Sequence, residues 1–184
     1  MSRINGKFIT FITGGARSGK SSFAEKLAAE YTDVTYIATA DCLDAEMEER
    51  IKIHKLRRPH SWQTWEGDIT SLPDEIAGMS GALVLDCLTM YLTRRFLAAP
   101  ESESDDEAAW FAVEREILSS VEKIFTAVNC RLIAVSNEIG LGVVPPYLMG
   151  RRFRDIQGRA NQLAASVSDE VAFMVSGLPL WVKK

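Results

Sequence analysis

The amino-acid sequence predicts an α/β protein in three layers, with a mostly parallel sheet between helices and an antiparallel edge strand at the C-terminus. Two observations lead to this prediction. Short apolar runs with the composition of buried strands alternate with helical patterns along the chain. In addition, a glycine-rich loop at residues 14–21 joins the first apolar run to the first helical pattern, as in P-loop nucleotide-binding folds.

The loop reads Gly14-Gly15-Ala16-Arg17-Ser18-Gly19-Lys20-Ser21 and fits the phosphate-loop pattern G-x-x-x-x-G-K-[ST]. Glycines let backbone N–H groups turn toward phosphate oxygens, the lysine reaches the β- and γ-phosphates, and the serine hydroxyl can bind Mg²⁺. The β-rich run 7–13 precedes the loop and the helical pattern 22–30 follows it, as the motif requires. Because chance matches occur in only about one chain in a hundred, we interpret residues 14–21 as a nucleotide-binding loop.

Four weaker segments follow the first helical pattern. Residues 34–38 predict a short strand, and a helix is expected from Asp44, its N-cap, to Leu56. Residues 62–66 predict a third strand because they are rich in aromatic side chains. A short amphipathic helix, which we expect Pro73 to interrupt, is indicated by Ile69, Leu72 and Ile76.

The apolar run Ala82–Asp86 is the second landmark of the sequence. A buried parallel strand that ends in aspartate brings a carboxylate to the edge of the sheet where the phosphates bind. Asp86 is therefore predicted to bind Mg²⁺, with Ser21 as the other protein ligand, or to act as a base near the nucleotide. The alternative is that Asp86 is the N-cap or turn residue of the helix expected at 88–97.

The second half of the chain continues the alternation. Residues 100–107 are acidic and predict a solvated loop before the next helix. That helix has the clearest apolar periodicity, at Trp110, Val113, Ile117, Val121, Ile124, Phe125 and Val128. The buried strand 132–136 follows, and the loop 137–146 then leaves the end of the sheet at which ligands bind in such folds.

A long helix and two strands complete the predicted fold. The core side of the helix is expected to consist of Phe153, Ile156, Ala160, Leu163 and Val167. Residues 171–175 predict a strand, the turn 177–179 reverses the chain, and residues 180–182 predict the antiparallel edge strand.

With 184 residues and 47% hydrophobic content, the chain is expected to form one domain, residues 1–184. A net charge of −4 argues against non-specific nucleic-acid binding, which needs a basic surface. Cys42, Cys87 and Cys130 lack metal-ligand spacing and predict buried thiols of a reducing compartment. No apolar run approaches the length of a membrane span and no signal-peptide pattern is found, so we expect a cytoplasmic protein that is not integral to the membrane.

The phosphate loop alone is compatible with kinases, GTPases, motor ATPases and nucleotide sensors. The chain lacks the guanine-reading Asn-Lys-x-Asp motif of GTPases and the basic surface of a helicase. His54 lies among Arg50, Arg57 and Arg58, whose charges favour the neutral, nucleophilic imidazole and can neutralise phosphate. Taken alone, a half-buried helix histidine is the more common interpretation of His54, and His60 is interpreted as a loop residue.

A likeness to one family runs through nearly the whole chain, in residues 14–21, 38–40, 46–47, 50–54, 58–59, 85–90, 136–142, 152–155 and 177–180 and at Trp62, Thr64, Glu66, Gly158, Asn161 and Gln162. In these blocks the sequence resembles the bifunctional adenosylcobinamide kinase/adenosylcobinamide-phosphate guanylyltransferase family of cobalamin biosynthesis. The phosphate loop is shared by many families, whereas the blocks around His54 and at 136–142 are specific. Tyr91 and Arg94 depart from the family, which usually has Trp and Asn there, and these departures could alter the corrinoid side of the site.

The resemblance implies two reactions. Such enzymes phosphorylate the aminopropanol hydroxyl of the corrinoid adenosylcobinamide with ATP or GTP, and then transfer GMP from GTP to that phosphate through a guanylylated histidine. By position, His54 would be this nucleophile, Lys20 and Asp86 would complete the catalytic set, and Mg²⁺ would be the cofactor. Members of the family look trimeric, so the resemblance also implies a homotrimer.

Further nucleotide contacts are expected outside the loop, at Ala38, Thr39, Ala40, Lys55, Arg58 and Glu66. A group of arginines either holds substrate phosphate or a subunit contact, or forms a solvated helix face with ion pairs; it comprises Arg151, Arg152, Arg154 and Arg159. Two alternative functions stay open: a small-metabolite kinase limited to γ-phosphoryl transfer, and a nucleotide-sensing regulator. Acceptor-dependent turnover excludes the regulator, and covalent labelling by α-labelled GTP separates the two enzymes.

Overall fold

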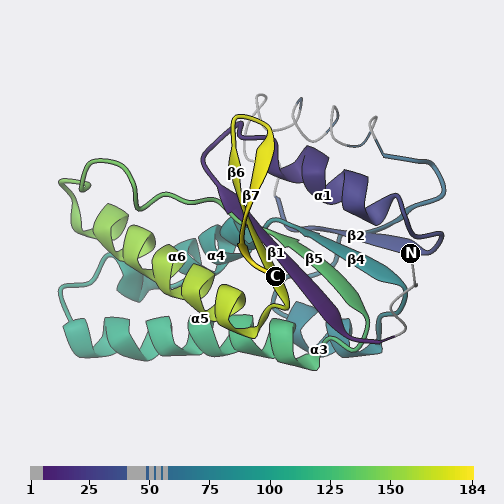
Figure 1. The fold of residues 1–184 in the computed structure, drawn as a ribbon. Helices are drawn as coiled ribbons and strands as arrows, with labels where there is room; N and C mark the ends of the chain where they lie inside the picture. Colours follow the sequence, from purple (N-terminus) through teal and green to yellow (C-terminus); the bar gives the residue numbers. More distant parts are fainter. Residues whose placement is uncertain (1–5, 41–48, 50–51, 53–54, 56–57) are drawn as a thin grey trace.

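Seven strands form one sheet in the order β3-β2-β4-β5-β1-β6-β7. The structure is a computed structural model that describes residues 6–40, 49, 52, 55 and 58–184. All neighbouring strands run parallel except β6 and β7, which are antiparallel. Helices lie on both faces of this sheet (Figure 1), so the predicted three-layer α/β fold with an antiparallel C-terminal edge is confirmed.

The strands agree closely with the predicted segments. They are β1 (Phe8–Gly14), β2 (Val34–Ala38), β3 (Gln63–Trp65), β4 (Ala82–Asp86), β5 (Arg131–Val135), β6 (Glu170–Val175) and β7 (Leu178–Lys183). The last strand begins earlier than predicted because the turn consists of Ser176 and Gly177, both at positive φ. Pro179 then lies within the edge strand, where its missing N–H costs no ladder bond on the free side.

The helices divide between the two faces of the sheet. Helix α1 (Lys20–Ala28) covers one face, and α4 (Leu88–Leu97), α5 (Glu107–Ala127) and α6 (Leu148–Val167) cover the other (Figure 1). The short elements are α3 (Leu72–Glu75) and the 3₁₀ turns η1 (Ile76–Gly78) and η2 (Pro100–Ser102). None of the described helices is long and apolar enough to cross a membrane. The helix predicted at 44–56 falls mostly outside the described residues, of which Glu49, Lys52 and Lys55 are helical.

Strand side chains alternate between two separate cores. On β4, Leu83 and Leu85 belong to the core under α4, α5 and α6, whereas Val84 belongs to the core under α1. On β5, Leu132 and Ala134 share the first core, and Ile133 and Val135 share the second. This alternation determines the face on which each polar side chain at the end of a strand emerges.

The prediction that Pro73 interrupts a helix is wrong. Pro73 lies in the first turn of α3, where the backbone N–H groups have no helical partner and proline is well tolerated. Ile69, Leu72 and Ile76 are all buried, so the predicted apolar positions are confirmed.

The predicted core side of α6 is confirmed except at Val167, and Phe153 and Leu163 are partly buried and pack against the core. Ile156 and Ala160 are buried, but Val167 is 39% exposed at the end of the helix. The buried side also includes Arg152, Gln157 and Asn161, which apolar periodicity cannot detect. These three residues bury polar groups because each finds hydrogen-bond partners on neighbouring elements.

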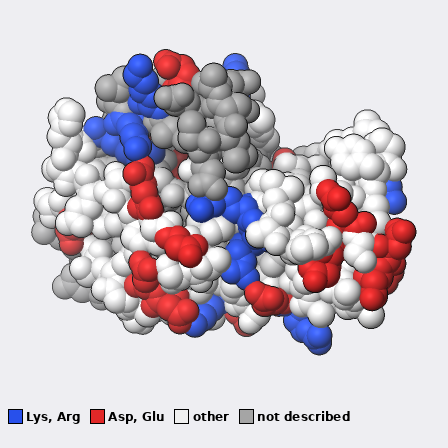
Figure 2. Space-filling model, turned by 180° about the vertical axis from the view of Figure 1, so that it is seen from behind, with Lys and Arg blue, Asp and Glu red and all other residues white. Residues whose placement is uncertain are grey.

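The acidic segment 100–107 is not simply a solvated loop. Asp106 caps α5, since its side chain accepts hydrogen bonds from the N–H groups of Ala108 and Ala109 at 3.0 and 3.1 Å. Ser102 is buried, and Arg152 binds the carbonyl groups of this segment. On the face seen in Figure 2, acidic and basic side chains are interspersed rather than separated into one basic and one acidic surface.

Candidate nucleotide site

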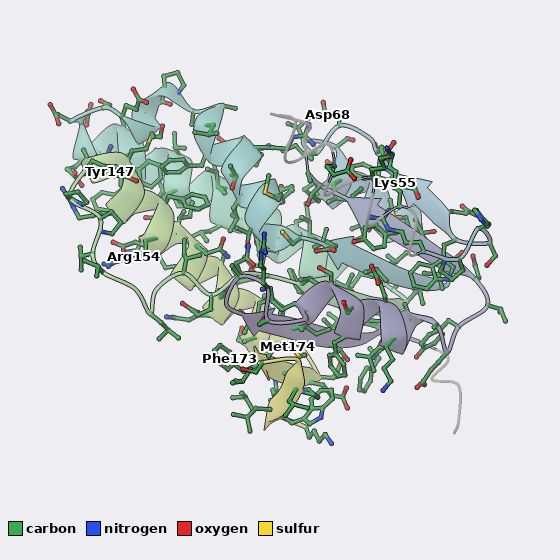
Figure 3. All side chains as sticks on the ribbon, turned by 90° about the horizontal axis from the view of Figure 1, so that it is seen from above. Lys55, Asp68, Tyr147, Arg154, Phe173 and Met174 are labelled. Carbon is green, nitrogen blue, oxygen red and sulfur yellow. The ribbon has the colours of Figure 1, made fainter. Side chains whose placement is uncertain are left out.

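The predicted phosphate loop joins β1 directly to α1, with Gly14 as the last strand residue and Lys20 as the first helical one. Gly14, Arg17 and Gly19 have positive φ values of 149°, 56° and 92°. A Cβ atom on Gly14 would lie 2.7 Å from the carbonyl oxygen of Met174, so only glycine fits this position. Figure 3 shows Met174 on β6 beside β1.

Lys20 is the cation enclosed by the loop. Its side chain is only 7% exposed, and Nζ donates a hydrogen bond to the carbonyl oxygen of Gly15 at 2.6 Å. Burial lowers the pKa of Lys20, while the nearby Cys87 and Asp86 act in the opposite direction. A partly desolvated ammonium attracts an anion strongly, because little water screens its charge.

Two buried hydroxyl groups near the loop have no hydrogen-bond partner among the described residues. They are Ser18 Oγ, within the loop, and Thr13 Oγ1, one residue before it. Ser18 is one of the predicted site residues, whereas sequence reasoning missed Thr13 because a threonine is ordinary in a β-strand. Buried hydroxyl groups normally find partners, so Ser18 Oγ is available to a ligand. Thr13 follows the alternation of Ile9 and Phe11 on β1 and points to the α6 side of the sheet, away from α1.

Asp86 ends β4 at the same edge of the sheet. The hydroxyl of Tyr36, on the neighbouring β2, donates a hydrogen bond to Asp86 Oδ2. Burial and the Asp86 charge raise the pKa of Tyr36, so its proton is firmly held. The N-cap residue of α4 is Cys87 and makes no side-chain cap. The alternative interpretation of Asp86 as that N-cap is therefore not supported.

Arg58 lies over the ring of Tyr36, with Cζ 3.3 Å from the ring centroid. Its Nε and Nη1 are buried and have no hydrogen-bond partner in the part of the chain that the structure describes. A guanidinium group with unsatisfied donors beside a carboxylate-bound tyrosine has the chemistry of a phosphate-binding arginine. Arg58 and Asp86 therefore both contact Tyr36, so the structure brings these two predicted site residues close together.

Hydrogen bonds connect the strand ends along this edge. Thr39 Oγ1 bonds with both the N–H and the carbonyl group of Cys87, at 2.8 and 2.7 Å. The N–H of Glu138 donates to the carbonyl of Gly14 at 2.9 Å. Through such contacts β2, β4 and β5 hold their ends at fixed positions relative to the loop. The turn residues Ala38 and Ala40 are half-buried beside the buried Thr39.

The remaining predicted site residues differ in position and exposure. Lys55 and Glu66 form an ion pair with 2.6 Å between Nζ and Oε1, and both side chains are about half exposed. Figure 3 shows Lys55 on the opposite side of the molecule from Tyr147 and Arg154. Ser21 is half-buried, the tip of the loop at residues 15–17 is exposed, and His60 is an exposed loop residue, as expected. His54 lies outside the described residues.

The arginine group on α6 forms contacts within the protein. Arg159 pairs with the buried Glu114 at 2.5 Å, Arg154 pairs with Asp155 at 3.6 Å, and Arg151 donates to the carbonyl groups of Pro145 and Pro146 at 3.3 and 2.8 Å. These contacts favour the interpretation as a helix face with ion pairs, although Arg152 is buried rather than solvated. Tyr91 is also buried, and its hydroxyl donates to Ser120 Oγ at 2.8 Å, so this departure lies in the core.

The sheet and its loop define a P-loop nucleotide-binding protein. The fold is similar to that of a type III secretion system ATPase of pathogenic bacteria, with a TM-score of 0.54 and 12% sequence identity over 90% of this chain. The present chain spans half the length of that ATPase chain, and a likeness at this identity concerns the fold alone.

Within this class, the sequence profile of the cobinamide kinase / cobinamide phosphate guanyltransferase family matches residues 10–182. The chain is 38% identical to the bifunctional adenosylcobalamin biosynthesis protein CobU of Salmonella typhimurium, over 94% of this chain and 98% of that protein. It is 42% identical to the corresponding protein CobP of Pseudomonas aeruginosa, over 94% of this chain and 95% of that protein. The chain therefore belongs to the cobinamide kinase / cobinamide phosphate guanyltransferase family.

Proposed function

We propose that the chain catalyses both reactions of its family at the site formed by the phosphate loop, Asp86 and Arg58. The first reaction phosphorylates the aminopropanol hydroxyl of adenosylcobinamide with ATP or GTP, and the second transfers GMP from GTP to the new phosphate. The observation that carries this proposal is the placement of three groups suited to a nucleotide triphosphate at one edge of the sheet. They are the buried ammonium of Lys20, the carboxylate of Asp86 and the guanidinium of Arg58, whose buried Nε and Nη1 have no hydrogen-bond partner among the described residues.

In the kinase reaction, the loop and Lys20 hold the β- and γ-phosphates. The acceptor hydroxyl attacks the γ-phosphorus in line, the bond to the β-phosphate oxygen breaks, and a nucleoside diphosphate leaves. Lys20 offsets the charge on the transferred group, and Ser18 Oγ is free to donate to a phosphate oxygen. The rest of the loop (Gly14, Gly15, Ala16, Arg17 and Gly19) contributes backbone N–H groups, and Ala38, Thr39, Ala40, Lys55 and Glu66 are proposed as flanking nucleotide contacts.

Mg²⁺ fits the donor set that the site offers. Ser21 supplies a hydroxyl and Asp86 a carboxylate, and oxygen ligands of this kind hold Mg²⁺ together with substrate phosphates. Tyr36 donates to Oδ2 of Asp86, and the carboxylate would hold the metal ion together with Ser21. When bound, Mg²⁺ supplies Lewis-acid polarisation of phosphate oxygens. We therefore propose Ser21 and Asp86 as its protein ligands.

The guanylyl transfer uses the same bound triphosphate with a different electrophilic atom. The imidazole of His54 attacks the α-phosphorus, a P–N bond forms, and pyrophosphate leaves from the position that the loop holds. A phosphate oxygen of adenosylcobinamide phosphate then attacks the guanylylated His54, the P–N bond breaks, and adenosylcobinamide-GDP is released. Arg58 is the proposed partner of the α-phosphate, because its buried Nε and Nη1 have no hydrogen-bond partner among the residues that the structure describes.

Labelling with GTP that carries a radioactive α-phosphate tests this assignment. In the presence of Mg²⁺ the protein is expected to retain one GMP and release pyrophosphate, through a bond that is labile in acid and stable in alkali. His54→Ala should remove the adduct and the guanylyl transfer while leaving most of the kinase activity, because the acceptor hydroxyl attacks the γ-phosphorus without the imidazole. His60→Ala, in an exposed loop, serves as the control and should change neither.

The outcomes separate the possible functions. An adduct that persists in His54→Ala, or that maps to another side chain, contradicts the role of His54. Kinase turnover without any adduct in the unmodified protein indicates a kinase limited to γ-transfer, and the absence of acceptor-dependent turnover indicates a nucleotide sensor.

We further propose that residues 1–184 act as one domain and that three copies assemble, as the family resemblance implies. Light scattering of the protein in solution measures the size of the assembly.

A further inference from the structure

Strand β5 carries a polar residue, Asn137, into the candidate site. In the sheet β5 lies between β1, which leads into the phosphate loop, and β4, which ends in Asp86. Its pairing with β1 continues beyond Val135, because the N–H of Ser136 donates to Ile12 O and the N–H of Glu138 donates to Gly14 O, both at 2.9 Å. The backbone is therefore still extended through Glu138, and successive side chains point to opposite faces.

The direction of Asn137 follows from its neighbour. Ser136 points to the α6 side, where its Oγ donates to Asn161 Oδ1 at 2.7 Å and accepts from Gln157 Nε2 at 2.9 Å. Asn137 must then point to the other side, the side of α1, which Ile133 and Val135 share on the same strand. Asp86 emerges on this side as well, since it follows the alternation of Val84 and contacts Tyr36.

Side chains hold the main chain of Asn137 from two directions. Its N–H donates to Thr89 Oγ1 at 2.8 Å, and its carbonyl oxygen accepts from Asn161 Nδ2 at 3.0 Å. Thr89 takes the place of a ladder acceptor because β4 has already ended at Asp86. Thr89 and Asn161 are 6% and 7% exposed, so the clamp is buried and shielded from water. The position of Asn137 is thereby fixed relative to both β4 and α6.

The carboxamide of Asn137, in contrast, makes no hydrogen bond with any residue that the structure describes. The residue is half-buried and lies between Gly14 and Asp86 along the sheet edge. A firmly held residue whose side-chain donor has no partner among the described residues is suited to a ligand.

We propose that the Asn137 carboxamide donates a hydrogen bond to the terminal phosphoryl group of the bound nucleoside triphosphate, and thereby distinguishes triphosphates from diphosphates. This inference rests on the proposed nucleotide site. In the kinase reaction the group is the γ-phosphoryl that is transferred, and in guanylyl transfer it becomes part of the leaving pyrophosphate. A neutral amide donates to either species without adding charge, and it does not titrate.

The test compares the binding of two probes by calorimetry in the presence of Mg²⁺: GTP with an α,β-methylene bridge, which blocks GMP transfer, and GDP. Asn137→Ala should weaken binding of the triphosphate by about 10- to 100-fold, the range for a charge-assisted hydrogen bond, and that of GDP much less. Asn137→Asp has the same shape but places a carboxylate against the phosphate, so the loss should be larger. Asn129→Ala is the matched control, because Asn129 is exposed near the other end of β5.

Equal losses for triphosphate and GDP would show that Asn137 acts through the structure of the loop, and an unchanged triphosphate affinity would show no contact at all. Either result overturns the inference. If the unmodified protein bound neither probe, the proposed nucleotide site itself would fail, and the inference with it. Thermal unfolding of Asn137→Ala should match that of the unmodified protein, since the change removes no hydrogen bond between the described residues.

Discussion

Ser18 in the phosphate loop and Arg58 over Tyr36 each have a buried polar atom without a hydrogen-bond partner among the described residues. Leaving such an atom unsatisfied costs about 1–3 kcal/mol, so a protein retains it where a ligand supplies the missing partner. Lys20 belongs to the same pattern, because burial lowers its pKa and a bound phosphate would compensate for that burial. At the scale of single residues, the site is marked by polar groups that the fold leaves incomplete.

Cys87 provides a pH-dependent test of the environment beside Asp86. Burial and the Asp86 charge raise the pKa of the Cys87 thiol from 9.0 to about 12. Because the thiolate is the reactive form, alkylation of Cys87 by iodoacetamide at pH 8.5 should be about a thousandfold slower in the native than in the unfolded protein. The folded state keeps this proton while the unfolded state loses it, so the contribution of Cys87 to stability decreases as the pH rises from 9 toward 12.

Peptide mass spectrometry of native and urea-unfolded protein, alkylated for equal times, measures the difference at Cys87. Asp86→Asn removes the charge and should accelerate the reaction of the native thiol, because one cause of the raised pKa is lost. Alkylation of native Cys87 as fast as that of the unfolded chain would contradict the burial of this thiol.

Helix α6 is attached to the segment before α5 by one side chain. The guanidinium of Arg152 donates to the carbonyl oxygens of Glu101, Ser102 and Ser104 at 3.1, 3.2 and 2.6 Å, and to Glu107 Oε1 at 3.0 Å. Its Cζ also lies 5.1 Å from the ring centroid of Trp110. The guanidinium supplies hydrogen-bond donors that water would otherwise have to provide to these carbonyl groups. The positions of η2 and of the start of α5 therefore depend on α6.

Arg152→Met should therefore lower the free energy of unfolding by about 1–3 kcal/mol, because it leaves buried carbonyl groups without a donor. This corresponds to a decrease of roughly 2–10 °C in the midpoint of thermal unfolding for a chain of this length. Arg154→Met is the matched control on the same helix, since Arg154 makes a long contact of 3.6 Å with the exposed Asp155 and should change stability by less than about 1 kcal/mol. Calorimetry measures the midpoint of thermal unfolding of both variants. Equal midpoints for Arg152→Met and Arg154→Met would contradict the proposed attachment.

For the molecule as a whole, the sheet order places one phosphate loop beside one carboxylate. Strands β1 and β4 are separated only by β5, and all three carry a site or candidate site residue at their carboxyl ends. This is the edge at which ligands bind in open α/β sheets. A single site of this kind can serve two transfers if the triphosphate stays in place while the attacked phosphorus changes from γ to α.

Lys20→Ala tests whether both reactions depend on this one site. Both rates should decrease by at least about 10²-fold, because Lys20 offsets phosphate charge in each transition state. Lys26→Ala, an exposed lysine on the same helix, should leave both unchanged. The two activities are measured by phosphate transfer from γ-labelled ATP and by GMP transfer from α-labelled GTP. Retention of either one in Lys20→Ala would mean that the reactions use separate sites.

Local sequence patterns by themselves predicted most elements of this protein and the phosphate loop, and the resemblance to known sequences predicted the family. Strand runs such as Ala82–Asp86 and the helix 88–97 agree with the structure because they depend on apolar periodicity, which is a property of neighbouring residues. The phosphate loop can be recognised in the sequence for the same reason, since its backbone conformation requires glycine at given spacings. The predicted role of His54 rests on the resemblance alone, and the described residues do not include it.

Only the tertiary structure decided which polar residues of distant elements meet. The stacking of Arg58 on Tyr36, the clamp of Thr89 and Asn161 on Asn137, and the attachment by Arg152 each join segments that are far apart in the sequence. No local pattern contains this information, because a buried polar side chain is stable only when the fold supplies its partner, and the order of the strands determines that partner.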